Sequence, residues 1–194
     1  MSESPKSEEA ASQSEPPKSQ QWAEFYKAVD RLKIGLLGTY RQGVGPVSRA
    51  MVPWRNGPDF MFIANINSQK FKDLEASKEC QITFQDSSTQ DWICISGIAT
   101  TADNKDPRIK ELYTPGLKAW FADLGDGIHT GGADDPRMAL IELHAKYITY
   151  WKVTVGSFGF MKEITQATMT GKVAKTGIMR TFEEEDIEAE RCSS

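Results

Sequence analysis

Residues 60–74 read FMFIANINSQKFKDL, a strand pattern that runs directly into a helix pattern. The first part, 60–65, is rich in β-favouring residues, and 67–76 has the spacing of a short helix that Asn67 or Ser68 can cap. The first amides of such a helix point outward at the positive end of the helix dipole, which favours a bound anion.

Two side chains in this stretch and one before it could complete an anion site. Ser68 offers a hydroxyl and Lys70 an ammonium group, while Arg49 lies on a strand one hairpin earlier. A guanidinium is suited to bidentate contact with phosphate, so Arg49 could reach the same anion. The alternative is a capped surface helix whose basic residues are simply solvated.

The rest of the chain alternates strand patterns with turns and has few helices. Strands are predicted at 33–41, 49–54, 60–65, 80–85, 92–102 and 138–153, and helices at 22–33, at 67–76, from Pro107 and within 115–124. The short connections favour antiparallel pairing, and six strands with few helices suggest a closed barrel without exposed edges. The predicted fold class is mainly β with flanking helices.

The charge is concentrated at the two ends of the 194-residue chain. The chain has 23 basic and 27 acidic residues. The segment 1–21 holds 2 basic and 4 acidic residues, and the segment 179–194 holds 2 basic and 6 acidic residues. The body at 22–178 is left with 19 basic and 17 acidic residues. Both end segments are too polar to bury a core, so each is predicted to be a disordered tail around one domain.

Composition excludes several functional classes. No apolar run approaches the roughly 18 residues that a membrane span needs, and the polar N-terminus is unlike a secretory signal. Three scattered cysteines indicate neither a disulfide framework nor a zinc site, so a cytoplasmic location is expected. The body lacks the basic stripes typical of nucleic-acid binding.

Catalytic signatures are sparse, whereas aromatic residues are plentiful. Of the two histidines, His144 fits a strand pattern and His129 lies in the glycine-rich loop at 125–137; no catalytic triad or metal site is predicted. Trp92, Trp120 and Trp151 could line the core or form the flat walls that a ring cofactor needs.

Seven segments in this order resemble the pyridoxamine 5′-phosphate oxidase-like flavin-binding split barrel, in particular its general stress protein branch with the fungal blue-light-inducible proteins. They are SRAMVP, FMFIANINSQKFKDL, ITFQD, WICISGIA, LKAWF, GGADDPR and ITYW, spread over roughly 22–170. The resemblance implies a six-stranded antiparallel split barrel that dimerises and binds FMN at the dimer interface.

The resemblance also implies roles for individual residues. Arg49 matches the strand arginine that contacts the flavin phosphate, and Ser68 and Lys70 match the phosphate-binding Ser-x-Lys. The remaining implied contacts are with the ring: strand backbone at Ala50, Met51, Ile63, Ala64 and Asn65, and aromatic side chains at Trp92, at Trp120 near the pocket mouth and at Trp151 from the partner chain.

The implied function is flavin binding, with FMN expected and FAD possible. The chain lacks the Arg-x-His signature with which the true oxidases hold pyridoxal, so the resemblance does not imply that reaction. One reading is a flavin-dependent oxidoreductase of unknown substrate. The other is a non-catalytic module that binds flavin or a tetrapyrrole.

Overall fold

The structure, a computed structural model, describes residues 15–193. Helix α1 (Lys18–Arg31) buries Trp22, Phe25 and Val29, which confirms the helix predicted at 22–33. The helix begins inside the segment expected to be a disordered tail at 1–21, and residues 1–14 of that segment lie outside the described part of the chain.

Eight antiparallel strands form one sheet in the order β2-β1-β5-β6-β7-β4-β3, with β8 also paired to β7. Their bounds are β1 (Gly35–Arg41), β2 (Gly45–Met51), β3 (Trp54–Asn56), β4 (Asp59–Asn65), β5 (Glu79–Gln85), β6 (Trp92–Ala102), β7 (Met138–Val153) and β8 (Gly177–Phe182). The antiparallel class is confirmed, but two features of the prediction are wrong. The sheet has more than six strands, and it is open rather than closed.

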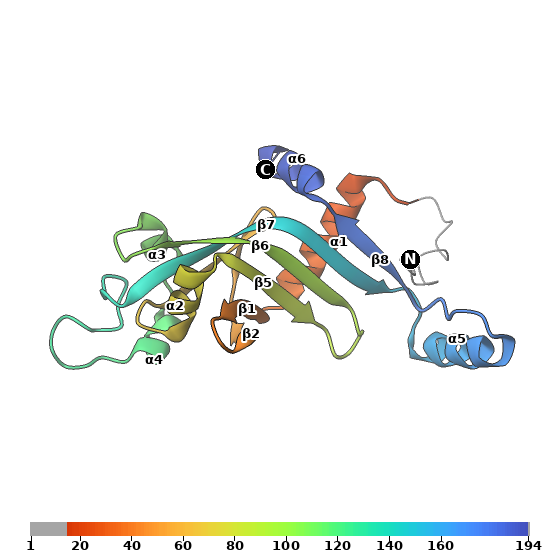
Figure 1. The fold of residues 1–194 in the computed structure, drawn as a ribbon, viewed down its shortest axis with the longest axis horizontal. Coiled ribbons are helices and arrows are strands. Elements are labelled where there is room, and N and C mark those ends of the chain that lie inside the picture. Colours follow the sequence, from red (N-terminus) through yellow and green to blue (C-terminus); the bar gives the residue numbers. More distant parts are fainter. Residues whose placement is uncertain (1–14, 194) are drawn as a thin grey trace.

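The sheet stays open because the long strand β7 is shared between two neighbours on the same flank. Its first half, Met138–Leu143, pairs with β4, and its second half, Ile148–Val153, pairs with β8. β4 and β8 therefore occupy different halves of the same edge of β7. Figure 1 shows β8 beside β7.

The single strand predicted at 49–54 is also wrong, because the segment contributes to two strands. β2 ends at Met51 and β3 begins at Trp54. Pro53 separates them, since proline has no backbone N–H to donate to a strand ladder.

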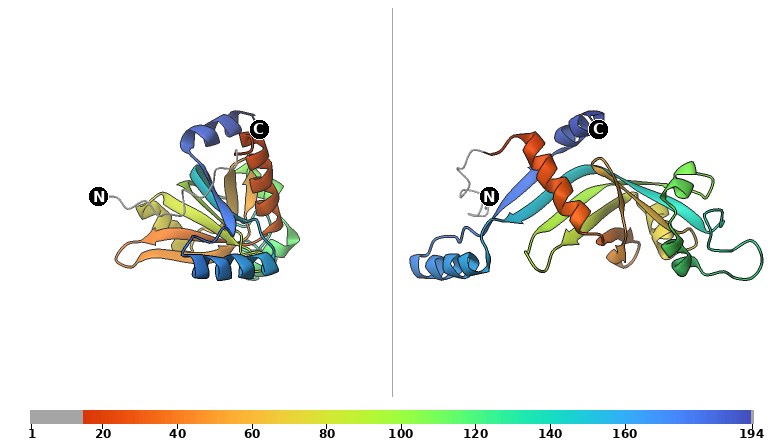
Figure 2. Two further views of the ribbon diagram at one scale, coloured as in Figure 1. Left: turned by 90° about the vertical axis from the view of Figure 1, so that its right-hand side faces the viewer. Right: turned by 180° about the vertical axis from the view of Figure 1, so that it is seen from behind.

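One face of the sheet is covered and forms the main core. Figure 2 shows α1 lying across this face. The fully buried side chains there include Phe25, Phe60, Phe84, Ile95 and Phe182. A smaller cluster lies under α3 (Pro107–Leu112) and α4 (Lys118–Phe121), where Ile109 and Phe121 pack with Met138.

The opposite face of the sheet carries no helix from the described chain over its central part, and it carries no charge there. Residues that pair directly share a face, so three rows can be followed across the strands. They are Ala50–Leu36–Thr83–Cys94–Thr149–Thr181, Ser48–Gly38–Gln81–Ser96–Tyr147 and Gln85–Trp92–Trp151–Met179. We call these three rows the uncharged face; apart from Gly38, their residues are all partly or fully exposed.

A bulge interrupts the long β6–β7 ladder. The register shifts between Ser96 and Gly97, and a Cβ placed on Gly97 would lie 2.0 Å from the carbonyl oxygen of His144. Only glycine permits this approach of the two backbones.

The disordered acidic tail predicted at 179–194 is not observed, because this segment is folded as part of β8 and as helix α6 (Glu184–Ser193). Phe182 is fully buried and stacks on Trp22 with ring centroids 3.8 Å apart. Ile187 of α6 is also fully buried. The disordered tail was predicted because the segment is rich in charged residues. These two apolar side chains and the ion pairs of its arginines instead hold the segment on the sheet.

Helix α5 (Ser157–Thr170), between β7 and β8, was not predicted. It projects from one end of the molecule and lies away from the sheet, as Figure 1 and the right-hand view of Figure 2 show. Within residues 15–193, no helix combines the length and the apolar character of a bilayer span.

Candidate functional site

The candidate site lies where β4 turns into helix α2 (Gln69–Ala76). The side chain of Asn65 accepts a hydrogen bond from the Asn67 amide at 2.9 Å, which forms the tight turn after the strand. Ser68 occupies the predicted N-cap position, yet its hydroxyl donates to the Asn65 carbonyl at 2.6 Å rather than capping the helix. The first amides of α2 therefore have no side-chain cap from Ser68.

A buried carboxylate, Asp73, connects this helix to strands β1 and β2. It accepts hydrogen bonds from Thr39 at 3.0 Å, from Arg41 at 3.1 and 3.2 Å, and from Arg49 at 3.3 Å. Burial alone would raise the pKa of Asp73, but the hydrogen bonds from Arg41, Gln69 and Thr39 outweigh it and hold the pKa at about 2. Asp73 is therefore ionised at neutral pH.

Arg49 of β2 is held in place by hydrogen bonds to the neighbouring strand β1. Its Nη1 donates to the Leu37 carbonyl at 3.1 Å and to the Thr39 hydroxyl at 2.8 Å. Of its five N–H donors, these bonds and the one to Asp73 use three among the described residues, so two donors are left for a ligand.

Lys70 lies beside Arg49 and donates to the Ser68 hydroxyl at 2.9 Å. No carboxylate among the described residues forms an ion pair with Lys70. Burial lowers its pKa, and the neighbouring Arg49 cation lowers it further. Two cations held this close at a helix start would both be stabilised by an anion.

The charge balance of the cluster is positive. Arg41 and Arg49 bond to the single carboxylate of Asp73, and Lys70 lies beside Arg49, so the cluster has an excess of two positive charges. A phosphate monoester carries up to two negative charges at neutral pH and accepts several hydrogen bonds, so its chemistry fits this donor set.

The two strands beside the cluster leave backbone edges without a strand partner. β2 ends the sheet, and β4 is paired to β3 only from Asp59 to Met61. Ala50 and Met51 lie on the first of these edges, and Ile63, Ala64 and Asn65 lie beyond Met61 on the second. The side chains of Ile63 and Ala64 are buried, so these residues can offer only backbone groups to a ligand.

The structure does not bring the predicted aromatic residues to this cluster within one chain. Trp92 and Trp151 pair directly across β6 and β7, on the uncharged face, with β1 and β5 between them and β2. Trp120 of α4 is 85% exposed. If these side chains contact a ligand held by Arg49 and Lys70, a second chain must supply at least some of them.

Three members of the cluster were not predicted from the sequence: Thr39, Arg41 and Asp73. Asp73 resembles an ordinary surface residue in the run KFKDL, and only its position four residues after Gln69 on one helix face hints at its role. The ring of His129, by contrast, bonds to the local loop residue Asp126 at 2.6 Å.

Comparison with known proteins identifies relatives of this sequence. Residues 20–175 match the family described as pyridoxamine 5′-phosphate oxidase like. The protein bli-3 of Neurospora crassa is 36% identical over 137 residues, which is 71% of this chain and 65% of that protein. The aligned part is therefore slightly less than two thirds of the relative.

Solved structures share the fold at low sequence identity. A Clostridium acetobutylicum protein related to general stress protein 26 gives a TM-score of 0.63 at 17% identity, over 89% of this chain and 99% of that one. An FMN-binding protein of Nostoc punctiforme gives 0.51 at 14% identity, over 69% and 82%. A heme-binding protein of Mycobacterium smegmatis gives 0.51 at 12% identity, over 90% and 61%. These findings confirm the family resemblance and the antiparallel fold.

Proposed function

The chain belongs to the pyridoxamine 5′-phosphate oxidase-like family, and we propose that it is an FMN-binding protein of the general stress type. The observation that carries the proposal is the cluster of three cations with a single carboxylate beside helix α2, in which Arg41 and Arg49 bond to Asp73 and Lys70 bonds to Ser68. The FMN-binding structural neighbour supports the choice of a flavin. In this proposal the phosphate of FMN binds between Arg49, Ser68 and Lys70.

The flavin ring would extend from this phosphate site along the unpaired edges of β2 and β4. Backbone groups at Ala50, Met51, Ile63, Ala64 and Asn65 would contact its polar rim. Trp151 of a second copy, together with its neighbour Trp92, would supply an aromatic wall, and Trp120 would lie at the mouth. The proposed state is thus a cytoplasmic homodimer with the cofactor at the interface.

A bound flavin supplies one- and two-electron redox chemistry, while the protein binds and orients it. Among the described residues near the cluster, Asp73 is held ionised by its arginines and therefore cannot serve as a general acid at neutral pH. The chain's own residues accordingly act as binding and positioning groups. FAD would need extra room for its adenosine beside the same phosphate site.

The test is flavin titration of the double variant Arg49→Ala, Lys70→Ala against the matched control Lys72→Ala, an exposed lysine of the same helix. Losing two charge-assisted contacts of about 1.5–3 kcal/mol each should weaken FMN binding by at least 100-fold. The control should bind FMN as the wild type does. Lys70→Met, which leaves the Asp73 network intact, should by itself weaken binding roughly 10-fold or more. Unchanged affinity in both Lys70 variants, with a native circular dichroism spectrum, would refute the site.

The second candidate is a tetrapyrrole-binding module, which the heme-binding structural neighbour favours. An absorbance spectrum separates the two candidates, because heme gives a Soret band near 400 nm and FMN gives paired bands in the blue and near ultraviolet. If flavin binds, anaerobic reduction by nicotinamide donors then distinguishes an oxidoreductase from a carrier.

A further inference from the structure

None of the described side chains of helix α5 is buried against the rest of residues 15–193. Its apolar residues are among the most exposed of that part of the chain: Phe158 is 87% exposed, Met161 63% and Met169 82%. For comparison, α1 has the same length of 14 residues and buries four of them.

The sequence of α5 cannot hold this helix in water by itself. Isolated helices shorter than about 12–15 residues are marginal even when they are rich in alanine. α5 instead contains Gly159 and three threonines whose hydroxyls bond to the carbonyl four residues earlier, at 2.7–2.8 Å. Such bonds do not strengthen a helix. A helix of this composition gains stability from a surface that covers its apolar side chains.

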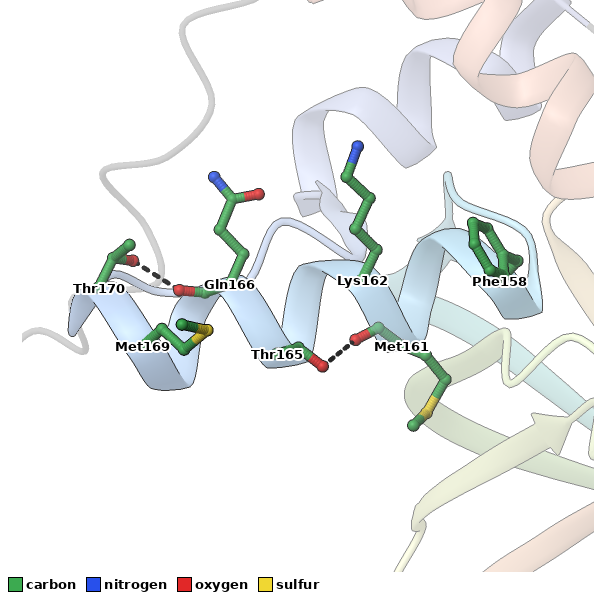
Figure 3. A pocket seen from close by; sticks show the side chains of 7 residues that line it. All are labelled: Phe158, Met161, Lys162, Thr165, Gln166, Met169 and Thr170. Carbon is green, nitrogen blue, oxygen red and sulfur yellow. Dashed lines mark hydrogen bonds between the residues drawn. The ribbon is translucent and has the colours of Figure 1, made fainter.

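The exposed face of α5 mixes apolar and basic character. Figure 3 shows Lys162 and Gln166 projecting along one edge of this face and Met161 along the other. A shallow hollow runs along the same face, and all the residues that line it belong to α5. The opposite wall of this hollow must therefore come from outside the described chain.

The segment 157–175 is basic, unlike the rest of the chain. It contains Lys162, Lys172 and Lys175 and a single acid, Glu163, so its net charge is +2. The whole chain carries −4, which leaves −6 for all other residues. The three lysines are exposed, whereas the carboxylate of Glu163 accepts a hydrogen bond from the backbone amide of Lys175 at 3.3 Å. Positive charge therefore surrounds the exposed apolar side chains.

The same mixture of residues continues past the end of the helix. Val173 is 49% exposed and lies between Lys172 and Lys175 in the sequence. A groove that receives a helix covers one helix face. A flat surface can contact both the helix and the loop that follows it, so it fits this extended patch better.

We propose that α5 and the loop at 171–175 bind the surface of a membrane that contains anionic lipids. The helix lies in the plane of the surface, with Phe158, Met161 and Met169 inserted at the boundary between headgroups and acyl chains. The lysines lie at the level of the headgroup phosphates, and Lys162 can bury its alkyl stem beside the methionines while its ammonium group stays there. At about 21 Å, a 14-residue helix is too short to cross the apolar core.

The position of α5 allows this contact. It projects from one end of the molecule, so a plane can reach it without meeting the sheet (Figure 1). The acidic remainder opposes binding only weakly, because charges more than about 8 Å from the surface are largely screened at physiological ionic strength. Anionic lipids face the cytoplasm, which agrees with the location proposed above. The inference does not depend on flavin binding, since α2 and α5 lie at opposite ends of the molecule (Figure 1).

The test is sedimentation of the full chain with vesicles made of phosphatidylcholine and phosphatidylserine in equal parts, and with vesicles of phosphatidylcholine alone. Two double variants change the patch: Met161→Glu with Met169→Glu, and Lys162→Glu with Lys172→Glu. Hydrogen exchange of the α5 amides is measured in the wild type with and without vesicles. Circular dichroism verifies the fold of each variant.

Two matched controls make the same changes at exposed positions elsewhere. Leu124→Glu with Ile128→Glu replaces two exposed apolar residues of the glycine-rich loop, and Lys78→Glu with Lys105→Glu reverses two exposed lysines. Each control therefore has the same net charge as its test variant, and only the position differs.

We expect the wild type and both controls to bind the phosphatidylserine vesicles, and binding to be lost on phosphatidylcholine alone and at high salt. Each lysine near an anionic surface contributes roughly fivefold to the affinity, so the lysine variant should bind about 20-fold more weakly or less. The methionine variant should lose at least as much, because it removes apolar insertion and adds negative charge. The α5 amides should gain protection when vesicles are added.

Several results would overturn the inference. They are a wild type that does not bind phosphatidylserine vesicles at low salt, equal binding to phosphatidylcholine alone, and vesicle binding without protection of α5. Test variants that bind like their controls would overturn it as well. A wild type that ignores vesicles but binds a synthetic, glutamate-rich amphipathic peptide would replace the membrane with a protein partner.

Discussion

Helices α5 and α6 flank the same strand, β8, and their relation to the fold is opposite to what their sequences suggest. α6 is short and acidic, but it buries Ile187, and Arg191 bonds to Asp59 at 2.8 and 3.0 Å. α5 is longer and more apolar, and none of its described side chains is buried.

The difference shows that contacts specific to one position can anchor a segment better than overall apolar character. Asp59 is buried, and it also accepts a hydrogen bond from the Ala145 amide at 2.8 Å. Without Arg191, this buried carboxylate would lose hydrogen bonds, which costs stability. The hydrogen bonds with Asp59 raise the pKa of Arg191. Among residues 15–193, no buried group forms an equivalent contact with the methionines of α5.

The largest expected effect separates the two helices directly. Ile187→Asp places an unpaired charge at a fully buried position and should lower the free energy of unfolding by about 3–5 kcal/mol. Met161→Asp makes the same change on α5 and should cost less than about 0.5 kcal/mol in dilute, monomeric protein. Urea denaturation measures both. Equal losses would show that α5 packs on its own chain after all.

A smaller loss is expected from the polar anchor of α6. Arg191→Ala leaves Asp59 buried with only part of its hydrogen bonding, and should cost about 1–3 kcal/mol. The matched change, Lys172→Ala, lies just after α5 and should leave the midpoint of urea unfolding unchanged. A neutral Arg191→Ala would mean that Ile187 and the remaining contacts of α6 hold the helix without this ion pair.

Hydrogen exchange should resolve the contrast without altering either helix. In dilute wild-type protein, the amides of α5 should exchange within about tenfold of unprotected rates, because opening an unsupported helix costs almost nothing. The amides of α6 should stay protected in the same sample. Equal protection of α5 and α6 would show that α5 is also held by contacts with the rest of its chain.

The smallest effect concerns pH and the attachment of β8. Glu24 of α1 accepts from Arg180 at 2.7 Å and pairs with Lys152 at 3.1 Å. Burial alone would raise the pKa of Glu24, but the bond with Lys152 and the charge of Arg180 lower it below 4.5. Its contribution is therefore present above the unfolded-state pKa and is lost as the pH falls below it.

Between pH 7 and pH 3.5, Glu24→Gln should reduce the acid-induced fall in melting temperature by an amount corresponding to about 1 kcal/mol or less. Glu185→Gln, an exposed acid of α6, is the control and should leave that fall unchanged. An identical fall in wild type and Glu24→Gln would remove Glu24 from the attachment of β8.

Local patterns in the sequence predicted much of the sheet. The strands expected at 92–102 and 138–153 are confirmed as β6 and β7. They could be predicted because they are rich in β-branched and aromatic residues, which favour strands whatever the rest of the fold. The order of the C-terminal segment could not be predicted in this way. It depends on Phe182 meeting Trp22, a contact between the two ends of the chain.

The candidate site was predictable in part for the same reason. Arg49, Ser68 and Lys70 could be grouped from the strand–helix pattern, and the structure brings them together. Asp73 and Thr39 could not be predicted, since their role arises from the packing of α2 against β1. The role of Trp92 and Trp151 depends on a second chain and stays a prediction.

The close approach at Gly97 also bears on how the chain reaches its fold. If β6 slipped by one residue along β7, Ser96 or Ile98 would take the place of Gly97, and its Cβ would collide with the carbonyl of His144. A slip would also turn every side chain of β6 to the other face and bring core isoleucines into water. The missing methyl group of one glycine therefore excludes misaligned forms of the longest strand pair during folding, before any side-chain packing has been completed.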